Sequence, residues 1–175
     1  ERKNAENRLR ESEERFRILF EQSPIGGMII GKHKQIIACN ETASKMLGYT
    51  EKEFRKMKVT DFDEGLTEEE IFDINEKIAG EKGGFQFETK HRTKSGETIN
   101  VLVAATNMQI DGKTYEFASF LDISERKNAA EALRKSEERL QKLYQIISNS
   151  ELNTGEKIKG LLQLGINEFE IENAF

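Results

Sequence analysis

The sequence contains little cysteine, proline, histidine or tryptophan, and these shortages exclude several classes of protein. Of its 175 residues, one is cysteine, one is proline, two are histidine and none is tryptophan. The single cysteine, Cys39, cannot form an internal disulfide, which fits a reducing, cytoplasmic compartment. Cysteine and the two histidines, His33 and His91, form no cluster with the spacing of a metal site. We therefore expect no disulfide framework and no bound metal.

Long apolar runs and an excess of positive charge are also missing. No run is long enough to span a membrane, and there is no signal peptide. The net charge of −5 provides no basic surface for nucleic acid. Charged residues make up 34% of the chain, so we expect part of it to be solvated helix. Because the chain starts without Met and stops at the apolar "ENAF", we interpret it as a fragment of a longer protein.

One highly charged segment occurs twice. It reads "ERKNAENRLRESEER" from Glu1 and "ERKNAAEALRKSEER" from Glu125. In the second copy, apolar residues recur at alternating spacings of four and three, as in a coiled coil. An amphipathic helix lying on its own domain is the other interpretation, but repetition favours the coiled coil. We expect a homodimer whose seam contains Leu9, Phe16, Leu19, Leu133, Leu140, Leu143 and Ile147.

The segment between the two copies alternates between short strands and helices. Residues 26–40 read as two strands around a polar turn, and Asn40 stands where a helix N-cap belongs. Thr50 with Glu53, and Thr67 with Glu70, match the capping box at the start of two further helices.

Three longer strands follow, over residues 85–93, 98–110 and 114–123. In the first, Phe85, Phe87 and Thr89 share one face, and the turns "KSGE" and "DGK" separate the three. The last two strands are apolar on both faces, so both faces of the sheet need a cover. We expect the helices to cover one face, and the opening helix or a second subunit to cover the other.

From about Phe16 to Lys127 the chain resembles a PAS domain. The matching pieces are "ESEERFRILFEQSPIGGMII", "IIACNETASKMLGYTEKEF", "HRTKSGE" at a hairpin, and "DGKTYEFASFLDISERK" at the end. The last piece is similar to the aspartate-isoleucine-threonine exit motif of that family, with Ser124 in place of threonine. The resemblance implies an α+β fold, in which short helices lie on one face of a five-stranded antiparallel sheet and form a sensory pocket. It also implies that the flanking helices transmit the signal and often dimerise.

These patterns divide the chain into four parts. We expect an N-terminal signalling helix over residues 1–21, a PAS domain over 22–124 and a coiled-coil linker helix over 125–150. Residues 151–175 are similar to the opening helix of a GAF domain cut off before its sheet, and a continued linker helix is the other interpretation.

The end of the last strand is the predicted signal-coupling junction, formed by Asp122, Ile123 and Ser124. A purely structural interpretation has Ser124 capping the following helix while Asp122 accepts hydrogen bonds. The functional interpretation is that the junction couples movement of the sheet to the coiled coil, and the two interpretations are compatible.

The resemblance also bears on cofactors. Heme-binding members use a histidine on the helix before the central strands, and residues 68–80 contain none. We expect His33 and His91 at the surface instead. Light-sensing flavin members need a cysteine in an Asn-Cys-Arg-Phe motif, which is absent, so Cys39 is expected to be a small core residue. Neither heme nor a photoactive flavin is therefore expected, and a small apolar ligand is the remaining candidate.

Such a ligand would occupy an apolar pocket, unless these side chains simply fill a close-packed core. Asn107 and Ser119 would orient the ligand if they face inward. The candidate lining residues are Met28, Ile30, Phe62, Ile74, Ile78, Phe87, Val101, Val103, Asn107, Phe117 and Ser119.

The chain lacks the residues of an enzyme. No glycine-rich phosphate loop follows a strand, and no phosphoacceptor histidine follows the coiled coil. The sequence therefore predicts a sensory or relay module of a multidomain signalling protein, of the histidine kinase or cyclic-dinucleotide enzyme type. It leaves open whether the module is a ligand-gated sensor or a ligand-free coupler whose partners are a second copy and neighbouring domains.

Overall fold

The structure is a computed structural model that describes residues 2–67, 69–70, 73–74, 77–78 and 84–172. The chain divides into two compact units, residues 1–125 and 126–175. The side chain of Leu9, one of the predicted seam residues, lies outside the described part.

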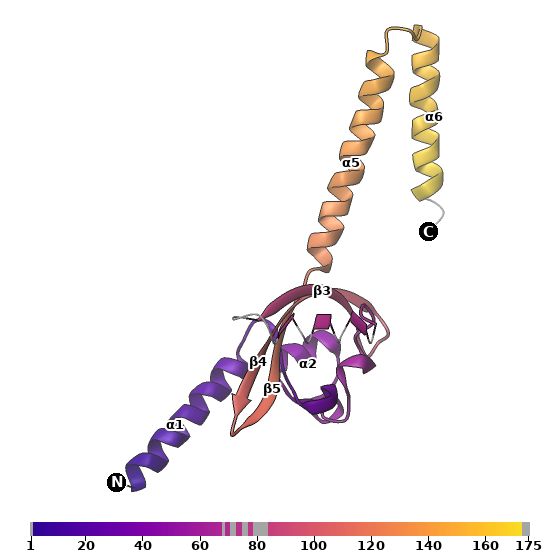
Figure 1. The fold of residues 1–175 in the computed structure, drawn as a ribbon. Coiled ribbons are helices and arrows are strands. Elements are labelled where there is room, and N and C mark those ends of the chain that lie inside the picture. Colours follow the sequence, from indigo (N-terminus) through magenta and orange to yellow (C-terminus); the bar gives the residue numbers. More distant parts are fainter. Residues whose placement is uncertain (1, 68, 71–72, 75–76, 79–83, 173–175) are drawn as a thin grey trace. The chain divides into compact units, whose positions relative to one another are not determined.

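The first unit is built on a five-stranded antiparallel sheet (Figure 1), as predicted. The strands are β1 (Gly26–Ile30), β2 (Ile36–Cys39), β3 (Phe85–Arg92), β4 (Thr98–Ile110) and β5 (Lys113–Asp122), in the spatial order β2-β1-β5-β4-β3. The "DGK" turn joins β4 to β5 through Asp111 and Gly112, whose φ angles of 51° and 71° are the left-handed values of a tight hairpin.

Alternation along the strands separates an inner face from an outer face. Val103 of β4 lies opposite Phe120 of β5 on the inner face, whereas Thr106 lies opposite Phe117 on the outer face. In β3 the inner set is Phe85, Phe87, Thr89 and His91, which continues the predicted period of two.

Short helices cover the inner face. They are α2 (Glu41–Leu47), α3 (Glu51–Phe54) and two 3-10 turns, η1 (Lys32–Lys34) and η2 (Val59–Asp61). Helix α2 packs against β1 and α3 against β2, and Leu47 and Phe54 are fully buried there. Asn40 is the N-cap of α2, and Thr50 forms a capping box with Glu53 in α3, so both predicted caps are confirmed.

The third predicted helix begins with the capping contacts expected of it. Glu70 N–H donates to Thr67 Oγ1 at 3.2 Å, and Thr67 N–H donates to Glu70 Oε2 at 2.8 Å. The described pairs 69–70, 73–74 and 77–78 are helical, and Ile78 is buried. Residues 68, 71–72, 75–76 and 79–83 of the predicted segment lie outside the described residues.

Helix α1 (Arg2–Glu21) reaches the outer face of the sheet at its C-terminal end. The ring of Phe20 lies 6.4 Å from the ring of Phe117 in β5. Further along α1, Phe16 and Leu19 are 59% and 75% exposed. The opening helix therefore covers part of the outer face and keeps an apolar surface of its own.

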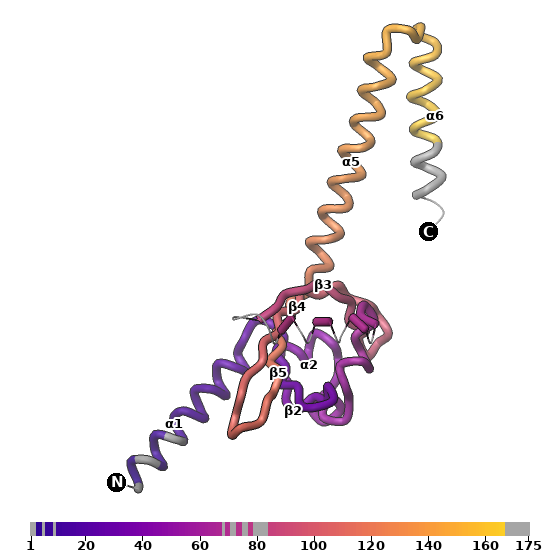
Figure 2. Tube along the Cα trace, in the orientation of Figure 1, coloured from indigo at the N-terminus to yellow at the C-terminus, as the bar shows by residue number. Residues whose placement is uncertain are grey.

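The second unit holds most of α5 (Ser124–Ser148) and all of α6 (Thr154–Glu172), which turns back alongside it (Figure 2). The two helices meet where Gly160 lies against Ile146, and Lys157 Nζ donates to the carbonyl of Ile147 at 2.8 Å. No helix in the described residues is long and apolar enough to cross a membrane.

Three of the four predicted seam residues of α5 are exposed, and the fourth, Leu143, is half-buried. Leu133, Leu140 and Ile147 are 61%, 63% and 57% exposed, whereas Ile146 faces Gly160. Leu133, Leu140 and Ile147 therefore form a solvent-exposed apolar stripe within this unit.

Candidate ligand cavity and signal junction

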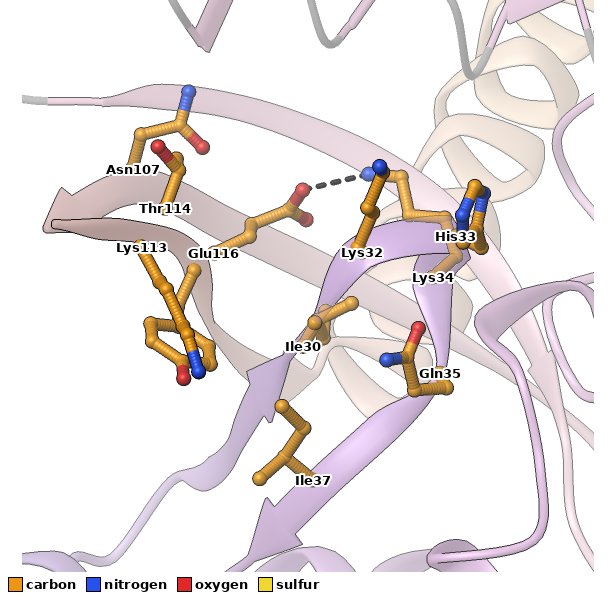
Figure 3. A pocket seen from close by; sticks show the side chains of 12 residues that line it. Ile30, Lys32, His33, Lys34, Gln35, Ile37, Asn107, Lys113, Thr114 and Glu116 are labelled. Carbon is orange, nitrogen blue, oxygen red and sulfur yellow. Dashed lines mark hydrogen bonds and ion pairs between the residues drawn. The ribbon is translucent and has the colours of Figure 1, made fainter. Parts of the chain in front are cut away.

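An open groove of about 820 Å³ lies between the β1–β2 turn and the β4–β5 hairpin (Figure 3). Lys34 Nζ is 2.6 Å from Glu116 Oε2 across it, and both side chains are mostly shielded from solvent. Lys32 and Lys113 also line the groove, which makes it basic in an acidic protein.

A smaller cavity of about 40 Å³ lies on the inner side of the sheet. Its apolar lining includes Phe62, Phe87 and Phe120, and its polar lining consists of Lys34, Asp63, His91 and Glu116. Ile30, Lys34 and Glu116 line both the groove and the cavity. The Lys34–Glu116 ion pair therefore stands between the two spaces.

The structure brings together only part of the predicted pocket. The cavity is lined by six of the candidates, which are Met28, Ile30, Phe62, Ile74, Phe87 and Val103. Ile78 and Val101 are buried in the surrounding core, where they are 3% and 0% exposed.

The predicted placement of Phe117 and Ser119 in the pocket is wrong. Phe117 and Ser119 point to the outer face, because the register pairs them with Thr106 and Ala104 rather than with the inner residues Ala105 and Val103. A strand's two faces differ by a single position, so an error of one residue moves a side chain across the sheet. Asn107 is in register with the inner residues, opposite Glu116, but it is exposed and lines the open groove (Figure 3) rather than the cavity.

The expectation that His91 lies at the surface is also wrong. His91 is 4% exposed, and its ring makes edge contacts with Phe62 and Phe120 at centroid distances of 5.1 Å each. Its Nε2 atom lies 3.5 Å from Asp63 Oδ2. A buried imidazole beside a buried carboxylate is thus a polar feature of an otherwise apolar cavity.

The loop that carries Asp63 is held against the edge of β3. Arg92 N–H donates to the Phe62 carbonyl at 2.7 Å, and Glu64 N–H donates to the Lys90 carbonyl at 2.8 Å. Asp63 Oδ1 accepts hydrogen bonds from Thr89 Oγ1 at 2.7 Å and from Gly65 N–H at 3.0 Å. The carboxylate is fixed on one oxygen, which leaves Oδ2 facing His91.

Gly65 allows this close approach. A Cβ atom at position 65 would lie 2.3 Å from Thr89 Oγ1 and 2.7 Å from the backbone nitrogen of Lys90. Any side chain here would push the loop away from β3 and separate Asp63 from Thr89.

Comparison with known proteins identifies the fold. A sequence profile described as "PAS domain" matches residues 25–125, which is more than half of the chain. The chain belongs to the PAS domain family. As a PAS domain it is a sensory signalling module rather than a catalytic domain.

Its relatives are pieces of signalling proteins. The PAS domain of an HTR-like protein from Haloarcula marismortui is 26% identical, with a TM-score of 0.60 over 69% of this chain and 99% of that one. A PAS domain from a two-component sensor histidine kinase has the same fold at 18% identity, with a TM-score of 0.57 over 64% of this chain and 97% of that one. The Escherichia coli protein named "Probable diguanylate cyclase DgcE" is 27% identical over 136 residues. That match covers 75% of this chain and 12% of the relative.

His33 and Cys39, on which the cofactor expectations depended, lie where the sequence placed them. His33 is exposed in η1, as expected. Cys39 is buried, as expected, and burial raises the pKa of its thiol, which keeps it in the unreactive thiol form. In the parts of the chain that the structure describes, no three His, Cys, Asp or Glu side chains are grouped as metal ligands.

The junction of this PAS domain ties β4 to the start of α5. Ile123 N–H donates to the Asn100 carbonyl at 2.8 Å, and Asn100 N–H donates to Ser124 Oγ at 3.0 Å. Asp122 Oδ1 accepts the backbone N–H of Ser124 at 2.8 Å, which confirms its expected role as an acceptor. The hydroxyl of Ser124 accepts from β4, because β4 extends past the end of β5 and presents an N–H there, and its expected capping of α5 stays a prediction.

Proposed function

We propose that this PAS module relays a change at its inner cavity through β5 into helix α5. Ala118 and Phe120 of β5 line the cavity, and Asp122 ends the same strand. Helix α5 begins two residues later, at Ser124. A displacement of β5 therefore acts on the start of α5 without an intervening flexible loop.

The hydrogen bonds at the junction are the observation that carries this proposal. Residues 122–124 are bound both to one another and to Asn100 of β4. The start of α5 is thus fixed to two neighbouring strands, so a change in their relative position alters its hydrogen bonds. A ligand shifts such an equilibrium only if its affinities for the two arrangements differ.

The output side of the proposal is pairing between two copies of the chain. The exposed stripe at Leu133, Leu140 and Ile147 has heptad spacing, and Phe16 and Leu19 supply an exposed surface on α1. Burial of such side chains between two helices is the usual reason for heptad spacing. A homodimer would convert a change at the junction into a change of helix register.

Catalytic output, in this proposal, belongs to other domains of a longer cytoplasmic protein of the histidine kinase or cyclic-dinucleotide type. The name of the Escherichia coli relative and the small share of it that is matched are consistent with this arrangement. The relay requires neither heme nor flavin.

Substitution of Asp122 by Ala tests the relay. Asp122 is exposed, so we expect the melting temperature to fall by less than about 5 °C. Loss of its bond to Ser124 should increase amide hydrogen exchange in the first turn of α5, while protection of the central strands is retained. Lys113→Ala at the other end of β5 is the matched control and should leave that turn unchanged. If Asp122→Ala unfolds the whole domain, the residue is structural and the relay proposal fails.

A further inference from the structure

The buried imidazole of His91 has one nitrogen with a neighbour and one without. Nε2 faces Asp63 Oδ2 at 3.5 Å. Nδ1 is fully buried, and within the described part of the chain it has no hydrogen-bond partner. Buried polar atoms in folded proteins are nearly always paired, so an unpaired one calls for an explanation.

The position of Asp63 determines whether Nδ1 of His91 is a hydrogen-bond donor or acceptor. Thr89 Oγ1 and the N–H of Gly65 occupy Oδ1 of Asp63, so Oδ2 is left to face the imidazole. A carboxylate beside Nε2 favours the tautomer that carries its proton there. In that neutral tautomer, Nδ1 holds a lone pair and is a hydrogen-bond acceptor.

We propose that the inner cavity binds a small neutral molecule that donates a hydrogen bond to Nδ1 of His91, and that this molecule enters between Lys34 and Glu116. This inference rests on the proposed sensory function and assigns it a ligand class. Short alcohols and primary amides are members of that class, since each joins a donor to a compact apolar body.

Size, polarity and charge all limit the ligand. A cavity of about 40 Å³ holds a molecule of only a few heavy atoms. Phe62, Phe87 and Phe120 supply apolar contacts, which favour a hydrocarbon body over a fully polar one. A charged ligand is disfavoured because burial of an ion is costly. The charges of Lys34 and Glu116 already face each other, and Asp63 already faces Nε2 of His91.

The route into the cavity follows from the residues that the two spaces share. Lys34 and Glu116 line both the outer groove and the cavity, and Figure 3 shows their side chains reaching toward each other across the groove. In the proposed route, separation of this ion pair connects the cavity to the groove. Lys34 lies in the short turn η1, and Glu116 lies in β5 near the β4–β5 turn, so a rearrangement of the Lys34 side chain can open the pair without moving the sheet.

The first experiment is a titration of the whole chain, labelled with ¹⁵N-histidine, with 2-propanol and separately with acetone. The two molecules are nearly identical in shape, but acetone has no hydrogen to donate. Imidazole nitrogen spectra report the tautomer, and His33→Gln identifies the signals of His91 because the chain has only two histidines.

We expect an unprotonated Nδ1 whose signal shifts saturably with 2-propanol, with an affinity at least tenfold higher than for acetone. His91→Phe, which keeps the aromatic contacts, should abolish this preference. A protonated Nδ1, equal affinities, or no saturable shift would overturn the inference.

Entry is tested by the rate of ligand exchange, measured from NMR line shapes. Lys34→Ala should speed both binding and release of 2-propanol at least threefold, whereas Lys32→Ala, which alters the same groove outside the ion pair, should not. Unchanged rates in Lys34→Ala would overturn the proposed route.

The imidazole nitrogen signals and the ligand exchange rates do not depend on α5. If 2-propanol does not bind as expected while Asp122→Ala gives its expected result, the ligand assignment alone is overturned. Normal binding without any effect of Asp122→Ala on α5 overturns the relay alone.

Discussion

At the scale of single residues, Asn40 caps a helix, as its sequence position predicts, and its side chain also bonds to other parts of the domain. Its side-chain oxygen accepts from Ala43 N–H at 2.8 Å and from Gly27 N–H at 2.9 Å. Its amide nitrogen donates to the carbonyls of Phe20 and Ile25 at 3.0 and 2.9 Å. One buried amide thus joins α1, β1 and α2.

Substitution of Asn40 by Ala should lower the free energy of unfolding by about 3 kcal/mol, because a helix cap is lost and buried backbone groups lose their partners. Asn40→Asp keeps the acceptor but removes both donated bonds, so it should also destabilise the domain. Chemical denaturation measures both, with the exposed Asn107→Ala as the control. An Asn40→Asp variant as stable as the wild type would show that the two donated hydrogen bonds do not contribute to stability.

The hydrogen bonds of Glu53 lead to a prediction about how the stability of the domain depends on pH. Its pKa is lowered from 4.5 to about 2, chiefly by the hydrogen bond from Lys94 Nζ, with further bonds from Thr50. A carboxylate whose pKa is lower in the folded state stabilises the protein above its unfolded pKa, and this contribution disappears as the pH falls through the folded value. The stability difference between wild type and Glu53→Gln should therefore be largest above pH 4.5 and vanish near pH 2.

Denaturation at a series of pH values checks this dependence. Glu13→Gln, an exposed carboxylate of α1, is the control and should give a difference that depends less on pH. A difference between wild type and Glu53→Gln that stays constant from pH 6 to pH 2 would contradict the role of Lys94.

Residues of the candidate site were predictable only where the strand pattern was followed to its end. Phe85, Phe87 and Thr89 were assigned to one face, and the same alternation places His91 beside them. Asp63 was not predictable in this way, because it lies on a loop whose position depends on its hydrogen bonds to β3 rather than on any local period.

At the scale of elements, helix starts and the alternation along each strand were the most predictable features, whereas the face of β5 that points inward was not predicted. The side chains of Asn40, Thr50 and Thr67 each accept a hydrogen bond from the backbone three residues later. Both partners of each bond therefore lie in one short stretch of sequence. The role of Ser124 was not predictable from its neighbours, since its partner Asn100 is 24 positions away in β4.

The α5 seam predicts a dimer that depends on particular side chains. Leu140→Asp places a charge in the seam and should raise the dimer dissociation constant at least tenfold, because burial of an unpaired charge is costly. Gln141→Asp introduces the same charge on a different side of the helix and should have a much smaller effect. Sedimentation equilibrium distinguishes them, and equal effects of the two variants would contradict the seam.

At the scale of the whole molecule, the inner cavity and the start of α5 share one strand. Phe87 of β3, Val103 of β4 and Phe120 of β5 lie side by side across the inner face and line the cavity. The five-stranded antiparallel sheet was predicted by the resemblance to PAS domains. The order of its strands was not predicted, because residue patterns indicate strands but not their neighbours.

The central claim, that the cavity and α5 are energetically coupled through the junction, is tested most directly by a double-mutant cycle. Phe87→Leu alters the cavity from β3, and Asp122→Ala breaks the junction. The quantity measured is the free energy of opening of the first turn of α5, obtained from amide hydrogen exchange, with Gln86→Ala on the opposite face of β3 as control. We predict a coupling energy above about 0.5 kcal/mol for Phe87 with Asp122 and none for Gln86. Effects of Phe87→Leu and Asp122→Ala that simply add would contradict the relay.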